Sequence, residues 1–325
     1  MPRVRPLALR AALCLAAGEL ACGRPHGPAS EDMTSGPVLV VLGTAQDGGL
    51  PHAACSCERC ARARAEPARA RRVASAAVVA DGRAWLVDAT PDLPDQLEAL
   101  AAATARPRGA VDRAPLAGLF LTHAHMGHYL GLAYLGFEAI HTRALPVHAS
   151  PRMAAFLGAN APWDQLVRLG NIELRPVVDE PVALAGGVRV AALAVPHRDE
   201  YTDTLGFVVE GPHRRILYVP DSAPWSQWPR ALPQVLADRK IDVALLDGSF
   251  YSPDELPGRD LSTLAHPLIV ETMDLLQPLV DAGRVRVIFT HLNHSNPAVD
   301  PASAAAAEIR RRGFEVAGDG LRVPL

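Results

Sequence analysis

The sequence predicts an α/β fold in which β-sheets pack against one another and helices cover their outer faces. Short, apolar, β-branched segments recur along most of the chain, and helical segments lie between and after them without strict alternation of strand and helix. In addition, 49% of the 325 residues are hydrophobic, which is enough to fill the core of one large α/β domain or of two ordinary ones.

The first part of the folded region begins with VLVVLG at 38–43, whose β-branched run is typical of a buried strand. Segments 74–80 and 84–89 predict a hairpin, because the Asp81-Gly82 pair between them favours a tight turn. The further elements expected here are a helix over 92–105, a strand over 116–122, a helix over 129–140 and a strand over 145–149.

The second part is predicted to contain most of the remaining strands, with helices that become regular towards the C-terminus. We expect strands over 172–177, 188–195, 205–210, 215–220, 242–247 and 285–290, and a final short strand pair within 314–323. We expect helices over 230–238, 267–283 and 301–313.

Residues 1–22 have the layout of a secretory signal, with arginines first, then the apolar stretch AALCLAAG, then small residues. The segment LAC that ends at Cys22 resembles the cleavage site of bacterial lipoproteins. We therefore expect an exported protein, periplasmic or lipid-anchored; if these residues are instead a disordered extension, a cytoplasmic location is expected. The apolar stretch is too short to span a membrane, so a lipid on Cys22 is the one membrane attachment expected.

The Ser/Gly/Pro-rich segment 23–36 predicts a linker, which leaves 37–325 as the folded domain. The net charge of −3 provides no broad positive field, so we expect a small-molecule substrate and no nucleic-acid partner. The basic run CARARAEPARARR at 60–72 is interpreted as a solvated helix face or loop, with a clamp for an anionic substrate as the alternative. The oligomeric state stays open.

The segment THAHMGH at 122–128 predicts a metal site. It contains three histidines and directly follows an expected strand. Further metal-competent side chains follow three other expected strands: His197, Asp221 and His291. Side chains at strand ends converge on one edge of a sheet when a rigid scaffold holds them, so we expect one shared metal centre.

On these residues the chain resembles the metallo-β-lactamase superfamily, which implies an αββα sandwich. Within it, the chain is similar to coenzyme PQQ synthesis protein B and to the phosphoribosyl cyclic phosphodiesterase of phosphonate breakdown. The resemblance covers roughly residues 37–325. The motifs that carry it are LGTAQDGGLP, CSCERC, LTHAHMGHYLGL, VPHRDEYTDTLGF, YVPDSAPW and FTHLNH.

The resemblance implies two metal positions bridged by Asp221. The first would be held by His123, His125 and His197, and the second by His128 and His291. The superfamily's remaining ligand for the second position falls on Gly127, which has no side chain to coordinate an ion. We expect the second ion to bind more weakly, unless another side chain such as Asp199 or Asp203 takes that place. One zinc, two unequal metals, or iron or manganese at the active site remain open.

The cysteine cluster CSCERC predicts a second, structural metal site, because an odd and tightly spaced set suits a metal better than disulfides. The resemblance implies that Cys55, Cys57 and Cys60 hold one zinc ion with His294 as the fourth ligand. His52 is the competing fourth ligand.

These features predict a metal-dependent hydrolase that uses a metal-bound hydroxide, acting on a phosphodiester or another small ester. Asp221 would orient the nucleophile, and His266 would protonate the leaving group. Two alternatives stay open through the resemblance to coenzyme PQQ synthesis protein B: an iron-dependent oxygenase, and a protein that binds or carries PQQ or its precursor.

Overall fold

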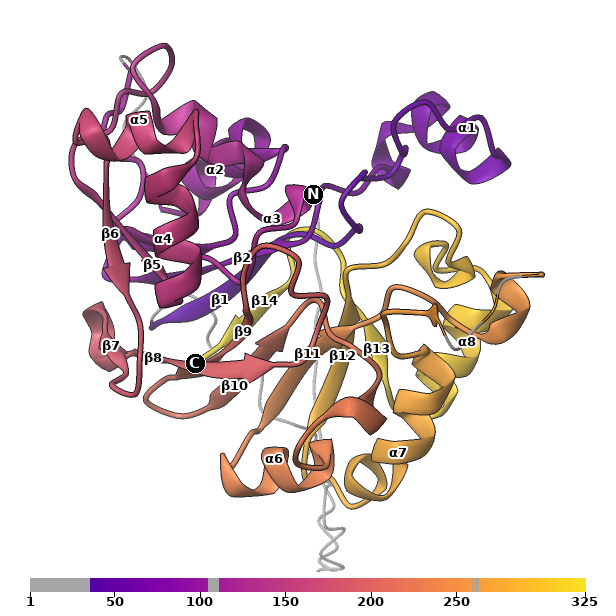
Figure 1. Cartoon of the computed structure of the whole chain (residues 1–325). Coiled ribbons are helices and arrows are strands. Elements are labelled where there is room, and N and C mark those ends of the chain that lie inside the picture. The colour runs from indigo at the N-terminus through magenta and orange to yellow at the C-terminus, as the bar shows by residue number, and fades with distance from the viewer. Residues whose placement is uncertain (1–35, 105–110, 259, 261–262) are drawn as a thin grey trace, which may run out of the picture. The chain divides into compact units, whose positions relative to one another are not determined.

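Two seven-stranded sheets form the centre of the compact unit Ser35–Leu325 (Figure 1). The computed structural model describes residues 36–104, 111–258, 260 and 263–325. The expected leader 1–22, and the linker 23–36 apart from Gly36, lie outside the described residues. Among the helices that the structure describes, none has the length and apolarity needed to span a membrane.

The first sheet has the strand order β14-β1-β2-β3-β4-β5-β6. It begins with antiparallel pairs, and β3 to β6 then run parallel to one another. The expected hairpin is confirmed, because β2 pairs with β3 and the residues between them, Asp81 and Gly82, have φ of 49° and 69°. The bounds are β1 Val38–Gly43, β2 Ser75–Ala80, β3 Arg83–Val87, β4 Gly118–Phe120, β5 Leu145–Ala149, β6 Ile172–Pro176 and β14 Arg322–Pro324.

The second sheet has the strand order β13-β12-β11-β10-β9-β8-β7. Strands β10 to β13 run parallel, and β7 to β9 complete the sheet as an antiparallel meander. The bounds are β7 Val182–Ala183, β8 Arg189–Val195, β9 Thr204–Glu210, β10 Arg215–Val219, β11 Val243–Asp247, β12 Arg286–Thr290 and β13 Glu315–Val316.

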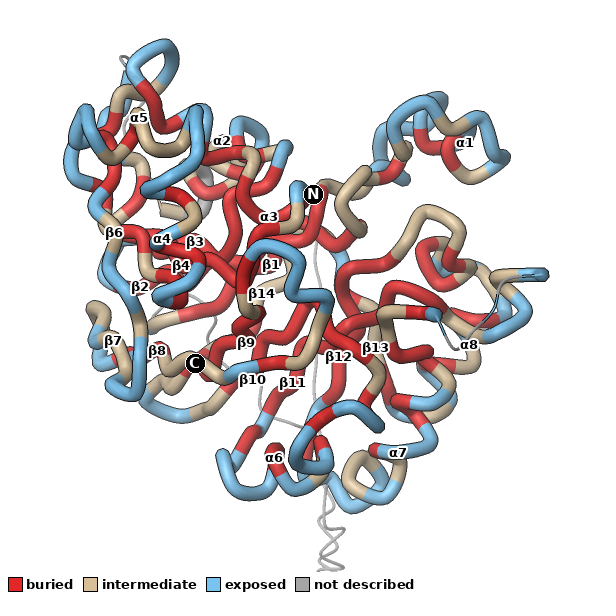
Figure 2. The backbone as a smooth tube through the Cα atoms, viewed as in Figure 1, coloured by how far each residue is buried: buried red, intermediate tan, exposed pale blue. Residues whose placement is uncertain are grey.

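The sheets pack face to face and carry helices on both outer faces, so the predicted αββα sandwich is confirmed. Alternation along β1 shows how the sequence achieves this: Leu39 and Val41 join the core between the sheets, whereas Val38 and Val40 face the helices. Apolar residues of α2, α4 and α5 cover the first sheet, and those of α6, α7 and α8 cover the second. Figure 2 shows the central strands of both sheets buried, whereas β6, β7 and β8 are partly exposed, as are the outward sides of these helices.

The α-helices of the described residues are mostly short, and several end at proline- or glycine-containing loops. Helix α1 projects away from the two sheets, next to the segment that contains the cysteine cluster (Figure 1). The bounds are α1 Glu58–Ala65, α2 Leu93–Ala103, α3 Met126–Tyr129, α4 Pro151–Ala159, α5 Trp163–Arg168, α6 Leu232–Asp238, α7 Ile269–Asp281 and α8 Ala304–Arg311.

The expected helix over 129–140 is wrong. The α-helix α3 ends at Tyr129, and a 3₁₀ segment, Leu130–Leu135, follows it. Gly131 explains the interruption, since a Cβ atom there would lie 2.1 Å from the carbonyl oxygen of Thr90. The backbone at Gly131 therefore packs directly against the backbone after β3, and the chain does not continue as a regular α-helix there.

The expected strand pair within 314–323 is also wrong in its pairing. Both strands exist, but β13 extends the second sheet beside β12, whereas β14 crosses to the first sheet and pairs with β1. The C-terminal strand thereby ties the two sheets together. The helices α4 and α5 were not anticipated, although Ser150 caps α4 by accepting a hydrogen bond from Met153 N, and Pro151 begins the helix.

Candidate metal centre

Metal-competent side chains from both sheets meet at one edge of the sandwich, where the parallel strands end. His123 follows β4, Asp221 follows β10 and His291 follows β12. The loop after β8 adds His197 to the same place. The structure therefore brings these strand-end side chains together, as expected. They form donor groups, and the potential ligand atoms of each group lie within 4.8 Å of one another.

The first group consists of His123, His125, His197 and Asp221. His125 Nδ1 lies 2.9 Å from His123 Nε2 and 3.2 Å from His197 Nε2. Asp221 Oδ2 lies 3.4 Å from His123 Nε2 and 3.1 Å from His197 Nε2. Zinc–nitrogen bonds are about 2.0–2.1 Å long, so donors at these separations can share one ion.

The electrostatics of this group keep its imidazoles in the form that binds metals. Burial lowers the pKa of His123 and of His125, and neighbouring histidines add to that effect. Both rings are therefore neutral at pH 7 and can donate a lone pair. Their other nitrogens are held in place: His125 Nε2 lies 2.9 Å from Glu200 Oε2, and His123 Nδ1 lies 2.9 Å from Thr122 Oγ1.

The second group lies on the other side of Asp221 and includes His128 and His291. Asp221 Oδ2 is 3.8 Å from His128 Nε2 and 4.0 Å from His291 Nε2. Both Nε2 atoms are buried and have no hydrogen-bond partner. Buried polar atoms without partners are costly, and a cation between them would satisfy all of these lone pairs.

Asp47, in the loop after β1, is the residue that sequence reasoning missed. It forms a donor group with His128 and His291, and its Oδ1 lies 3.6 Å from His128 Nε2. Neither of the substitutes considered from the sequence is placed in a donor group: Asp203 accepts a hydrogen bond from the Ser150 hydroxyl, and Asp199 is exposed. The signal in the sequence was the acid in the loop LGTAQDGGLP, but nothing local links it to the histidines.

His128 is oriented by Asp88, which follows β3 and is fully buried. His128 Nδ1 donates to Asp88 Oδ2 at 2.7 Å, while the backbone N–H of Thr122 donates to Asp88 Oδ1 at 2.8 Å. Burial opposes the charged form of His128, but Asp88 outweighs it and raises the pKa to about 9. A metal must therefore displace a proton from His128 at neutral pH.

We expect Asp88→Asn to lower the zinc affinity of this second position by about 10–100-fold, as is typical when the partner of a ligating histidine is lost. The amide would keep its oxygen on Thr122 and turn its NH₂ towards His128 Nδ1, which moves the ring proton to the nitrogen that faces the metal. Chelator competition measures the affinity. Asp95→Asn, on the exposed side of α2, is the control, and equal affinities in the two variants would refute this role.

His266 lies beside Asp221 and forms a further donor group with Asp221, Asp247 and His291. Its Nδ1 is 3.1 Å from Asp221 Oδ1 and 2.9 Å from Asp247 Oδ2. Burial disfavours its charged form, but Asp247 and Asp221 together raise the pKa of His266 to about 10. It can therefore carry a proton at neutral pH.

The cysteine cluster forms a separate group with His294. The Sγ atoms of Cys55, Cys57 and Cys60 lie 3.6, 3.8 and 3.6 Å from His294 Nδ1. These separations suit a tetrahedral ion with Zn–S bonds of about 2.3 Å. The alternative ligand His52 turns its Nδ1 to the carbonyl of Ala53 at 2.8 Å, and its ring packs against the His294 ring at a tilt of 39°. Burial raises the pKa of Cys60 to about 11, so zinc binding must remove its proton.

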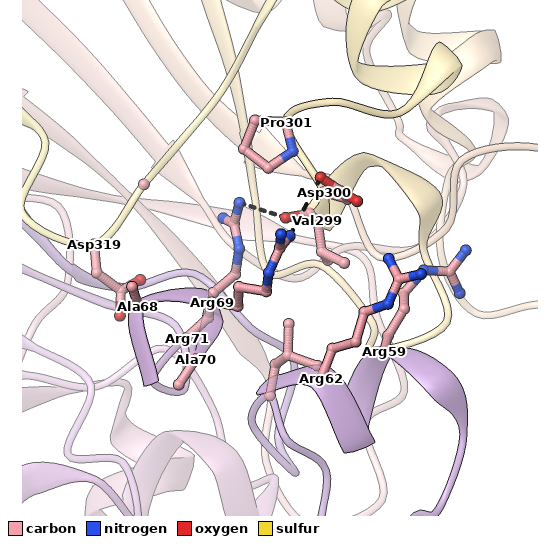
Figure 3. Close-up of a pocket in the computed structure, with 12 residues that line it drawn as sticks. Arg59, Arg62, Ala68, Arg69, Ala70, Arg71, Val299, Asp300, Pro301 and Asp319 are labelled. Carbon is pink, nitrogen blue, oxygen red and sulfur yellow. Dashed lines mark hydrogen bonds and ion pairs between the residues drawn. The ribbon is translucent and has the colours of Figure 1, made fainter. Parts of the chain in front are cut away.

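A cavity of about 410 Å³ lies away from the histidines, beside the basic run 60–72 (Figure 3). Its arginines already have partners: Arg69 pairs with Glu66, and Arg71 donates to the carbonyls of Val299 and Ala317. Arg62 pairs with Glu58 in the same helix. These arginines are therefore engaged by groups of the protein itself, and nothing favours a clamp for an anionic substrate there.

Comparison with known proteins agrees with this architecture. Residues 83–292 match the β-lactamase superfamily domain. Coenzyme PQQ synthesis protein B of Methylobacterium sp. (strain 4-46) is 29% identical over 312 residues, which cover 88% of this chain and 99% of that protein. The protein of the same name from Xanthomonas axonopodis pv. citri is 28% identical with the same coverage.

Solved structures show the same fold. Zn²⁺-bound PqqB from Methylobacterium extorquens superposes with a TM-score of 0.72 at 25% identity, covering 89% of this chain and 100% of that chain. A diphosphatase from the PhnP family superposes with a TM-score of 0.61 at 22% identity, covering 89% and 97%. The resemblance inferred from the sequence motifs is confirmed, and the chain belongs to the β-lactamase superfamily domain family.

Proposed function

We propose that this protein is a metal-dependent hydrolase that acts on a phosphodiester or another small ester. The observation that carries the proposal is that Asp221 Oδ2 lies near two sets of imidazoles. It is 3.4 and 3.1 Å from the Nε2 atoms of His123 and His197. It is 3.8 and 4.0 Å from the Nε2 atoms of His128 and His291. A hydrolytic site of two metals needs this kind of arrangement, in which one carboxylate reaches both positions. Fold relatives that are hydrolytic by name, the PhnP-family diphosphatase and human tRNase Z, support it.

The metal ions that these residues would hold, zinc by preference with iron or manganese as alternatives, supply a Lewis acid and lower the pKa of a bound water to about 7. Asp221 Oδ2 reaches the donors of both groups, so this carboxylate fixes where the reaction centre lies. His266 presents Nε2 beside Gln46, because its Nδ1 is engaged by Asp221 and Asp247. This protonated ring is the acid for the leaving group.

We expect His266→Gln to lower kcat by about 100-fold, within the range for loss of a general acid, while zinc content stays unchanged. The acid must be protonated to act, so kcat of the unmodified protein falls as pH rises through the pKa of His266. The variant lacks this alkaline decline. The measurement is kcat against pH with metal content determined in parallel, and a variant that keeps the full rate and the decline would remove His266 from the mechanism.

The hydrolase proposal is tested with the full chain, loaded with zinc or manganese, on bis(p-nitrophenyl) phosphate and on p-nitrophenyl esters. The expected result is turnover that a chelator abolishes and that added metal restores. Absence of turnover on every substrate by protein with filled metal sites would overturn the proposal.

A second candidate is a function related to PQQ synthesis, favoured by the 28–29% identity with coenzyme PQQ synthesis protein B over nearly the whole of those proteins. It would be an iron-dependent oxygenase, or a protein that binds PQQ or its precursor. Iron in the purified protein together with oxygen consumption would favour the oxygenase. Saturable binding of PQQ without turnover would favour the carrier.

A further inference from the structure

The loop after β1 occupies the space that a side chain at position 127 would need. A Cβ atom built on Gly127 would lie 2.0 Å from Asp47 Oδ1 and 2.8 Å from Asp47 Cα. No side chain fits at position 127 while Asp47 is there. The absence of a side chain at Gly127 therefore leaves room for Asp47. Asp47, from a distant part of the chain, lies where the superfamily's acid at 127 would lie.

We propose that Asp47 is a carboxylate ligand of the second metal position, together with His128 and His291. This inference rests on the metal centre of the proposed function but not on the reaction that the centre catalyses. It changes the expectation drawn from the sequence, because the second position then has a hard oxygen donor and a negative charge of its own.

The contacts of Asp47 fit a ligand better than a surface acid. The side chain is 42% exposed, so its carboxylate has open solvent within reach. Even so, Oδ1 is buried, has no hydrogen-bond partner and lies 3.6 Å from His128 Nε2, which is likewise buried without a hydrogen-bond partner. Two unsatisfied donor atoms facing each other at this distance leave room for one ion with bonds of about 2.0–2.2 Å.

The backbone around Asp47 is fixed to the strand end that supplies His291. Ala45 bridges to Leu292, and the backbone N–H of Gln46 donates to the carbonyl of Leu292 at 2.9 Å. Asn293 Nδ2 donates to Gln46 Oε1 at 2.6 Å. Asp47 thus approaches on a rigid support, which a metal ligand requires.

The chain continues from Asp47 through a tight turn that also depends on glycine. Gly49 N donates to the carbonyl of Gln46 at 2.7 Å, and Gly49 has a φ of +70°, which favours glycine. A Cβ atom on Gly48 would lie 2.4 Å from the His52 ring. The pair Gly48-Gly49 therefore lets the chain turn away immediately after the acid.

The test counts zinc ions in the full chain by titration with Zn²⁺ under chelator competition, which needs no substrate. Asp47→Asn should lower the affinity for the second active-site zinc ion. The loss should exceed the roughly 10–100-fold that is typical when only the hydrogen-bond partner of a ligand is removed. Asp47→Glu, the conservative variant that keeps a carboxylate at this place, should hold the second active-site zinc more tightly than Asp47→Asn does. Asp199→Asn, an exposed acid close to His197, is the matched control and should bind as the unmodified protein does.

The zinc of the cysteine cluster serves as an internal check that each variant is folded. The ligand assignment is overturned if folded Asp47→Asn keeps the second active-site zinc at unchanged affinity, or if Asp199→Asn loses it. Equal loss in Asp47→Asn and Asp47→Glu would also overturn it, because the carboxylate would then make no difference to zinc binding. Failure of the hydrolase proposal would instead appear as absent turnover with the zinc count intact.

Discussion

Replacing His123 and His197 together with alanine removes two of the three imidazoles of the first donor group, so we expect this group to lose its capacity to bind a metal ion. The rate of hydrolysis, kcat, should fall by more than roughly 10²–10³-fold, which is the usual effect of removing one hydrogen-bond donor to the transition state. The effect is larger because the activation of water by the metal is lost as well. The measurement is turnover of the substrate found in the phosphodiester and ester screen, with elemental analysis of the same samples.

The control for this prediction is His213→Ala, which removes an exposed histidine and should change neither metal content nor rate. One zinc should remain in the paired variant, held by the cysteine cluster. The catalytic role of the first group is refuted if the paired variant lacks active-site metal and still turns over at the full rate.

Cys60→Ser removes a buried thiol from the cysteine cluster and should cost one zinc and much of the stability of the surrounding segment. Zinc present at about 1,000 times its Kd stabilises a fold by about 4 kcal/mol. In a chain of this size, that loss should lower Tm by roughly 10 °C. Structural zinc ligands are worth roughly 10–16 kcal/mol in small peptides, and a smaller effect is expected here because two sheets already provide a large core.

Two histidine variants decide the fourth ligand of that cluster. His294→Ala should lose the same zinc as Cys60→Ser, because all three Sγ atoms surround its Nδ1. His52→Ala should keep it, because the Nδ1 of His52 faces a carbonyl. The reverse result, with zinc lost only in His52→Ala, would give the site to His52. Thermal unfolding and zinc content are measured on all three variants.

The sequence was informative where structure is determined locally. Strands of the core were recognisable from β-branched runs, and the donors that follow β4, β10 and β12 were recognisable because each comes directly after such a run. The two histidines of FTHLNH were also assigned to separate sites in advance, and the structure places His291 and His294 in separate donor groups.

What the sequence could not provide depends on contacts between distant segments. Asp47 reaches the second group only because its loop is fixed to Leu292, and Gly127 looks like a missing ligand until the loop is seen in its place. The break after Tyr129 has the same kind of cause, since Gly131 meets a backbone oxygen from another strand end. Pairing of β13 and β14 with different sheets likewise follows from the closed sandwich and not from their own residues.

The attachment of two metal groups to the same two chain segments has a thermodynamic consequence. Asp47 precedes Cys55 by one turn and a short loop, and His291 precedes His294 by three residues. An ion in the cysteine cluster therefore restricts both segments that face the second active-site position. Metal binding at the cysteine cluster and at the second active-site position is then linked. The linkage is reciprocal, so each ion raises the affinity for the other by the same factor. Zinc starvation of the cysteines would lower occupancy at the histidines as well, so the protein would gain and lose its metals cooperatively.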